Sequence, residues 1–198
     1  MNWRNQTLIL ASSSPRRAEL FRQAGLYFKM LPGKVVEVNH KKLSPARYAV
    51  ELSRLKAEEG LKKVTGELIY SFTFVVGADT IVVLNGKILE KPKDERDARR
   101  MLSLLNGKTH QVMTGVTVLH HPSKKIRSFV EKTEVTFRKM KIDEIDEYLR
   151  TREPLDKAGA YGAQGYGAKF ILKVKGCFYN VVGFPLARFF EEMDNWEI

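Results

Sequence analysis

The sequence has little cysteine and no long hydrophobic run, and each of these absences excludes a class of protein. Cys177 is the only cysteine among the 198 residues, which excludes a disulfide within the chain and leaves a structural zinc site with little support. No segment approaches the roughly 20 consecutive apolar residues that span a bilayer. The apolar stretch near the N-terminus is too short for the core of a signal peptide. We therefore expect a cytoplasmic protein without a membrane-spanning segment.

Histidine is also scarce, with four in the chain. His40 and His110 are isolated, and an ordinary hydrogen-bonded role fits them better than metal ligation. His120 and His121 are adjacent, and neighbouring residues of a strand point to opposite faces, so this pair is not suited to bind one metal ion together.

Repeats, low-complexity segments and linkers rich in glycine, serine or proline are absent too. We therefore predict one domain over residues 1–198, with a core large enough to fold alone, either as one body or as two lobes that share a cleft. The formal net charge of +11 favours an anionic partner. Because lysine and arginine are spread along the chain and interleaved with acids, we expect a discrete anionic substrate rather than nucleic acid. The alternative is general solubility, which would account for most of these lysines.

The first informative stretch is LASSSPRR, residues 10–17, which follows a short apolar run. The pattern predicts a strand over residues 8–10, a small polar turn and a helix that begins at Pro15 with Ser14 as its N-cap. Free amides at a helix start bind anions, and Arg16 and Arg17 would stand beside that site. A solvated surface helix would show the same local pattern, so both interpretations stay open.

A long helix is expected after Ser44, with Tyr48, Leu52 and Leu55 on its buried stripe. Lys56 follows Leu55 near the middle of this helix, where its ammonium group could extend over the edge of the stripe toward a cleft. The alternative is a surface lysine whose aliphatic stem alone is buried.

The segment around GADT, residues 77–80, reads as a buried strand followed by a hairpin. Asn85-Gly86 between two apolar runs is a strong signal for a type I′ turn, because both residues tolerate a positive φ. We expect Asp79 where the core strand gives way to a turn, a rigid mounting for a catalytic carboxylate. A turn-forming aspartate that caps backbone amides is the equal alternative.

Four glycines occupy residues 159–167, after a short helix expected over residues 142–150. The tract lacks the G-x-x-x-x-G-K-[ST] spacing of a phosphate loop, so we expect a loop dominated by its backbone. Gln164 within it carries both a donor and an acceptor, as recognition of a nucleobase edge requires. A glutamine in a flexible loop is the commoner explanation.

These motifs, in this order, resemble the Maf family of nucleoside triphosphate pyrophosphatases. The resemblance is carried by LASSSPRR, GADT, the hairpin that ends in Lys91-Pro92, LNGKTHQVMTGV, EPLDKAGAYGAQG at residues 153–165 and NVVGFPL at residues 180–186. It implies an α/β fold with a mixed, elongated, twisted sheet flanked by helices. It also implies two lobes around a central nucleotide cleft, similar to inosine triphosphate pyrophosphatase, and hydrolysis of a nucleoside triphosphate to the monophosphate and pyrophosphate.

The resemblance also implies residue roles. Asp79 would be the proton acceptor, and the conserved polar lining would comprise Arg17, Glu37, Lys56 and Lys91. Ser12 and Ser14 would bind phosphate. Glu37 and Asp79 would suit Mg²⁺ or Mn²⁺, hard ions that take carboxylate and phosphate oxygens together.

Substrate class in the family follows three positions, which here are Arg16, Thr80 and Gln164. This trio resembles the subgroup that acts on dTTP and UTP, and modified pyrimidine nucleotides are included in the expectation. A sister group that prefers 7-methyl-GTP has tryptophan and glutamate at the first and last of these positions. One departure from the family pattern is Glu90, where a glycine usually precedes Lys91.

A second function from another class is a regulator of cell division, which the family's septum-formation name suggests. Such a protein would sense nucleotides in the cleft or hold nucleic acid on its basic surface. The presence of Arg17, Asp79 and Lys91 together favours the enzyme. A homodimer is expected by family likeness alone.

Overall fold

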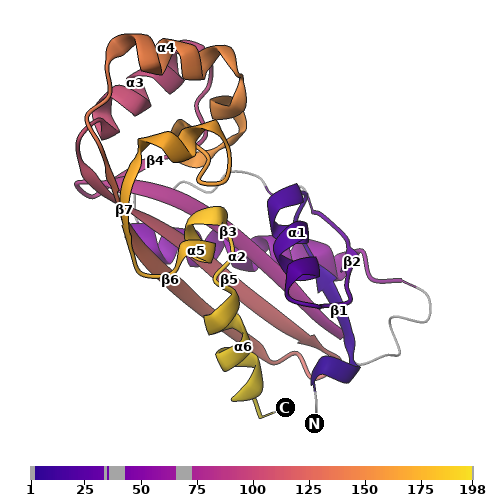
Figure 1. Ribbon diagram of the computed structural model, residues 1–198. Coiled ribbons are helices and arrows are strands. Elements are labelled where there is room, and N and C mark those ends of the chain that lie inside the picture. Colours follow the sequence, from indigo (N-terminus) through magenta and orange to yellow (C-terminus); the bar gives the residue numbers. More distant parts are fainter. Residues whose placement is uncertain (1–2, 34, 36–42, 66–72, 198) are drawn as a thin grey trace. The chain divides into compact units, whose positions relative to one another are not determined.

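The computed structural model describes residues 3–33, 35, 43–65 and 73–197. Within them a seven-stranded sheet has the order β2-β1-β3-β5-β6-β7, and β4 pairs with β3 (Figure 1). β1 is parallel to β2 and β3, whereas the β3/β4 and β6/β7 pairs are antiparallel. The sheet is mixed and flanked by helices, which confirms the predicted α/β class.

The elements alternate along the chain. The strands are β1 (Thr7–Leu10), β2 (Lys29–Met30), β3 (Thr73–Leu84), β4 (Lys87–Leu89), β5 (Thr109–His121), β6 (Ile126–Phe137) and β7 (Ile171–Lys175). The α-helices are α1 (Pro15–Gln23), α2 (Pro45–Lys62), α3 (Glu95–Leu105), α4 (Ile142–Arg150), α5 (Phe178–Val182) and α6 (Leu186–Asp194). Short 3-10 turns are η1 (Trp3–Asn5), η4 (Glu153–Asp156), η5 (Ala158–Ala160) and η6 (Tyr166–Phe170). None of the described helices is both long and apolar enough to cross a bilayer.

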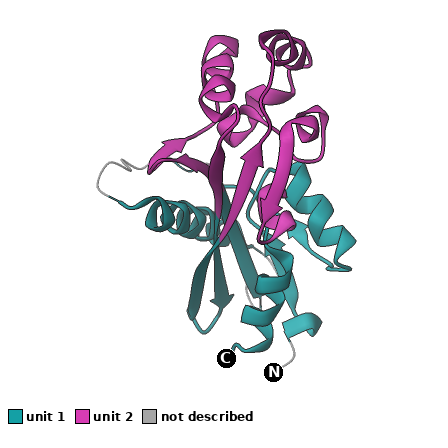
Figure 2. Cartoon of the chain, turned by 60° about the vertical axis from the view of Figure 1, so that its left-hand side comes forward, with its two compact units in different colours: residues 1–79, 114–131, 183–198 teal, residues 80–113, 132–182 magenta. Residues whose placement is uncertain are grey.

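The chain forms two compact units, drawn in teal and magenta in Figure 2. Unit 1 contains residues 1–79, 114–131 and 183–198, and unit 2 contains residues 80–113 and 132–182. The division falls inside β3, β5 and β6, so each of these long strands contributes to both units.

Unit 1 holds helix α2 very close to its sheet. A Cβ at Gly77 would overlap the carbonyl oxygen of Ser53, and one at Gly115 would overlap that of Ala49. The face of α2 that is buried is therefore a row of small residues, Ala49, Ser53, Ala57 and Gly60, together with Tyr48. The prediction that Leu52 and Leu55 form the buried stripe is wrong, because backbone this close to a strand has no room for leucine.

Unit 2 has its own apolar core, in which α3 and α4 cover the strands. Fully buried members include Leu102, Leu105 and Phe170. His110 lies in this core, where its Nε2 shares a 2.8 Å hydrogen bond with the hydroxyl of Tyr161. The ordinary hydrogen-bonded role predicted for this histidine is confirmed.

Several predicted boundaries agree with the structure. The helix predicted over residues 142–150 is α4, and Asn85 (φ 49°) and Gly86 (φ 76°) form the predicted hairpin turn. Asp79, however, lies inside the continuous twelve-residue strand β3 and not at its end. The prediction of a turn at Asp79 is wrong, because the strand continues through the polar pair Asp79-Thr80 into a second buried run.

Candidate active site

The start of α1 is capped as predicted. Ser14 is the N-cap, and its hydroxyl accepts a 3.5 Å hydrogen bond from the Arg17 amide. Pro15 occupies the first helical position, where a missing amide hydrogen costs nothing. The hydroxyl of Ser12, in the preceding turn, accepts a 3.2 Å hydrogen bond from the Ser14 amide. This confirms the predicted cap.

Arg17 is buried, whereas Arg16 is only half-buried. The Arg17 Nε donates to the Gly183 carbonyl at 2.9 Å, and Nη1 donates to Ser12 Oγ at 3.1 Å. Burial lowers the pKa of the Arg17 guanidinium, while the charge of Asp79 acts in the opposite direction. Because an arginine keeps its proton in proteins, the side chain is a fixed cation held by two internal acceptors.

Lys56 and Asp79 form the second charged feature of unit 1. The Lys56 ammonium donates to the Asp79 carboxylate and lies 3.4 Å from the Ala78 carbonyl oxygen. Both side chains are only partly exposed, at 25% and 16%. The ion pair depends on the close approach of α2 to Gly77, two residues before Asp79 on the same face of β3.

Lys56 therefore extends from its helix to the Asp79 carboxylate, and its predicted place beside a cleft stays a prediction. Unit 1 brings together Ser12, Arg17, Lys56 and Asp79, three of them charged. Such a group of one carboxylate and two cations beside a helix start can bind phosphate and accept a proton.

Three further predicted site residues, Thr80, Lys91 and Gln164, belong to unit 2. Thr80 follows Asp79 in β3, and alternation along a strand puts the two side chains on opposite faces. Lys91 is exposed in the connection after β4. Gln164 is exposed in the glycine-rich tract. Glu37 lies outside the described residues, so its predicted role stays a prediction.

One backbone hydrogen bond links the two regions of unit 2 that carry Lys91 and Gln164. The Gly159 amide donates to the Glu90 carbonyl at 3.1 Å. Gly159 has a φ of +68°, and a Cβ there would meet Val82 Cγ2 at 2.9 Å, so the position requires glycine. The backbone before Lys91 is thus held by the carbonyl of Glu90. A carbonyl is present whichever residue occupies position 90, so glutamate in place of the family's glycine keeps this hydrogen bond.

Sequence reasoning missed two supporting residues. Gly183 supplies the carbonyl that holds Arg17, and its glycine stands in the NVVGFPL motif that was used only for the resemblance. Glu153, the acid at the start of the glycine-rich tract, accepts hydrogen bonds from that tract's amides. An acid directly before several glycines was the available signal.

Comparison with known proteins identifies the family. The family model described as Maf-like protein matches residues 7–196. The chain belongs to the Maf family. A Maf relative from Carboxydothermus hydrogenoformans, named dTTP/UTP pyrophosphatase, is 45% identical over 189 residues, 96% of this chain and 98% of its own.

Other Maf relatives carry the same name. The Bacillus pumilus protein is 47% identical and covers 91% of this chain and 92% of its own length. A protein of Escherichia coli O6:K15:H31 is 44% identical, with coverage of 96% and 93%. Among solved structures, the Staphylococcus aureus Ham1 protein aligns with a TM-score of 0.47 and 16% identity over 84% of this chain and 80% of its own.

Proposed function

We propose that this chain hydrolyses dTTP and UTP, including modified pyrimidine nucleotides, to the monophosphate and pyrophosphate. The observation that carries the proposal is the group in unit 1: the Asp79 carboxylate against the Lys56 ammonium, with the buried guanidinium of Arg17 nearby. Relatives 44–47% identical that are named dTTP/UTP pyrophosphatase support the choice of substrate.

The reaction requires little covalent chemistry from the protein. A water oxygen forms a bond to one phosphorus of the α–β phosphoanhydride, the bond from phosphorus to the bridging oxygen breaks, and the water proton passes to Asp79. Arg17 and Lys56 offset the negative charge that grows on the phosphate oxygens. In this scheme Ser14 and the free amides at the start of α1 orient the phosphate chain, while Ser12 acts mainly through Arg17.

By family likeness we propose roles for Lys91, Thr80, Gln164 and Arg16 as well. Lys91 would add a third cation to the phosphates. Gln164 would recognise the pyrimidine edge, because its amide offers one donor and one acceptor. Arg16 and Thr80 would discriminate against other bases.

A divalent ion, Mg²⁺ or Mn²⁺, is part of the proposal. Among the described residues no group of three or more His, Cys, Asp or Glu side chains can hold a metal ion. By family likeness Asp79 and Glu37 are the carboxylates proposed for the ion, and of these two only Asp79 lies among the described residues. Mg²⁺ is commonly held by one or two carboxylates plus substrate phosphates, so this donor set fits. The ion would neutralise phosphate charge.

A nucleotide panel tests the proposal. Purified protein is incubated with each nucleoside triphosphate and Mg²⁺ or Mn²⁺, and pyrophosphate and orthophosphate are measured separately. We expect pyrophosphate from dTTP and UTP. Asp79→Asn should abolish this turnover, while Asp143→Asn, an exposed acid on α4, should not. Release of orthophosphate, or no turnover by the wild type, would overturn the proposed function.

A further inference from the structure

The glycine-rich tract of unit 2 is organised around one carboxylate, that of Glu153. Its Oε2 accepts a 2.8 Å hydrogen bond from the Tyr166 amide, and its Oε1 accepts one of 3.2 Å from the Gly167 amide. Oε1 also accepts a 2.9 Å hydrogen bond from the hydroxyl of Tyr148 on α4. One side chain thus satisfies two backbone amides and ties them to a helix.

Two of the glycines make room for this carboxylate. A Cβ at Gly162 would lie 2.7 Å from Glu153 Oε1, and a Cβ at Gly165 would overlap Oε2. The Tyr148 hydroxyl accepts a further 3.1 Å hydrogen bond from the Gly162 amide. Burial raises the pKa of Tyr148, so its hydroxyl stays a neutral donor to Glu153 at physiological pH. Gly162 and Gly165 are therefore explained by contact with Glu153 and not by a need for flexibility.

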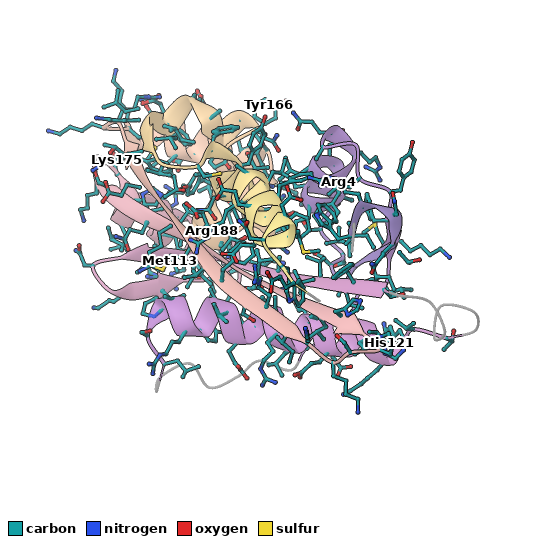
Figure 3. The ribbon with its side chains drawn as sticks, turned by 90° about the horizontal axis from the view of Figure 1, so that it is seen from below. Arg4, Met113, His121, Tyr166, Lys175 and Arg188 are labelled. Atoms are coloured by element: carbon teal, nitrogen blue, oxygen red, sulfur yellow. The ribbon has the colours of Figure 1, made fainter. Side chains whose placement is uncertain are left out.

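Gln164 lies between these two glycines. Its side chain is exposed, although the backbone on both sides is held, by Tyr148 at Gly162 and by Glu153 at Tyr166. Tyr166, labelled in Figure 3, is 68% exposed beside it. The Lys157 ammonium donates to the Glu153 carbonyl at 2.8 Å, which closes the tract at its other end. The backbone that carries Gln164 is therefore fixed by hydrogen bonds on both sides, while the Gln164 side chain is exposed.

We propose that Glu153 is a positioning residue for nucleobase selection, acting through Gln164. The proposal rests on the proposed function, because it assigns to Glu153 the task of holding the amide that recognises a pyrimidine. The Glu153 carboxylate accepts three hydrogen bonds, and hydrogen bonds to an ionised acceptor are stronger than those between neutral groups. Loss of that charge releases the amides of residues 166 and 167, and Gln164 then samples several orientations.

A double-mutant cycle tests this role. Glu153→Gln keeps the shape of the side chain but removes its charge and one acceptor. We expect Glu153→Gln and Gln164→Ala each to lower the preference for dTTP over GTP about tenfold, through KM, with kcat within about twofold. The double variant should be no less selective than Gln164→Ala alone. Additive losses would mean that Glu153 does not act through Gln164, and would overturn the proposal.

Two further variants separate positioning from general damage. Tyr148→Phe removes one donor to Glu153 and keeps the buried ring, so it should lower selectivity in the same direction by a smaller factor. It remains available should Glu153→Gln fail to fold. Glu147→Gln is the matched control, because it removes the same charge from an exposed acid on α4. The Glu147 Oε2 lies 3.8 Å from the Lys169 Nζ. If Glu147→Gln lowered selectivity as much as Glu153→Gln, the effect would not be specific to Glu153.

Amide hydrogen exchange tests the loop without relying on catalysis. In the wild type the amides of Tyr166 and Gly167 should exchange slowly, and Glu153→Gln should raise both rates at least tenfold while α3 and β5 are unchanged. Unprotected amides in the wild type would overturn the proposal. If the wild type does not hydrolyse dTTP or UTP but the exchange result is obtained, the proposed function fails and the loop architecture stands.

Discussion

Lys56 on α2 forms an ion pair with Asp79 in β3, 23 residues further along the chain. The contact requires α2 to lie almost against the strand, which Gly77 permits. The Lys56 ammonium offsets the charge of the Asp79 carboxylate, and under the proposed function it would turn to phosphate oxygens once a substrate binds. In the proposed mechanism Asp79 would then accept the proton in a site already supplied with positive charge.

Lys56→Met should lower kcat by about 100-fold, the usual cost of removing one group that stabilises transition-state charge. Lys62→Met is the control, since Lys62 lies on the same helix and is 70% exposed. Steady-state kinetics with dTTP measures both, and thermal melting checks folding. A Lys56 variant with wild-type kcat would rule out this role.

Gly77→Ala should destabilise the protein by about 1–3 kcal/mol, the cost of overpacking a core contact. The added methyl group would overlap the Ser53 carbonyl oxygen and would lie 2.6 Å from the Ala57 amide nitrogen. It should also reduce activity, because α2 must move and carry Lys56 away from Asp79.

Gly25→Ala serves as the comparison for Gly77→Ala. Gly25 has a φ of +70° with no atom within 4 Å of the built Cβ, so its cost is backbone strain of about 1 kcal/mol. Urea unfolding measures both variants. The prediction fails if the two variants lose equal free energy of unfolding and Gly77→Ala keeps wild-type activity.

Arg17→Lys should lower kcat/KM by at least about tenfold, because an ammonium cannot reproduce the planar fork that meets both Gly183 and Ser12. Ser12→Ala should have a smaller effect, since the Gly183 contact remains. Arg22→Lys, at a 61% exposed position on the same helix, is the control. If Arg17→Lys matches Arg22→Lys, the buried guanidinium has no part in catalysis.

Stability should fall on mild acidification because of His110. Burial lowers the pKa of His110 from 6.5 to about 4 in the folded protein. The unfolded chain therefore takes up a proton at a higher pH than the folded one, so stability is fully present above pH 6.5 and is lost as the pH falls toward 4. Between about pH 7.5 and 5 this group should remove about 2 kcal/mol of the free energy of unfolding.

Urea unfolding at the two pH values checks this effect. His110→Gln should lose stability at neutral pH but show a weaker pH dependence than the wild type. An unchanged slope in His110→Gln would assign the acid sensitivity to other groups.

Arg16→Trp combined with Gln164→Glu should shift preference from pyrimidine nucleotides toward 7-methyl-GTP. Tryptophan stacks on a methylated, positively charged purine, and a carboxylate favours its charge. The ratio of kcat/KM for 7-methyl-GTP to that for dTTP measures the change. An unaltered ratio would return Arg16 to the interpretation of a surface residue beside the helix start.

Local patterns predicted the short-range structure well. Ser14 and Ser44 each mark a helix start that the structure contains, since a cap is a contact between residues three positions apart. The hairpin at Asn85-Gly86 is local for the same reason. The resemblance, which depends on the order of motifs, led to the family that residues 7–196 match.

Long-range packing is where the sequence was insufficient. Leucines on α2 were expected inside, but Gly77 and Gly115 bring the helix so close that small residues are buried instead. Asp79 was expected at a turn, yet β3 continues because its second half pairs with β4. Neither result can be obtained from one segment alone, since each depends on the surface that the segment meets.

The sequence by itself determined the α/β class, the helix starts, the hairpin and the family, because these follow from residue order and from contacts within a few positions. Only the tertiary structure decided that Arg17 is held by Gly183, that Lys56 meets Asp79 and that Glu153 organises the tract around Gln164. Each of these contacts joins residues from different segments. Their energies depend on distance and burial in the folded chain, and neither quantity can be obtained from spacing along the sequence.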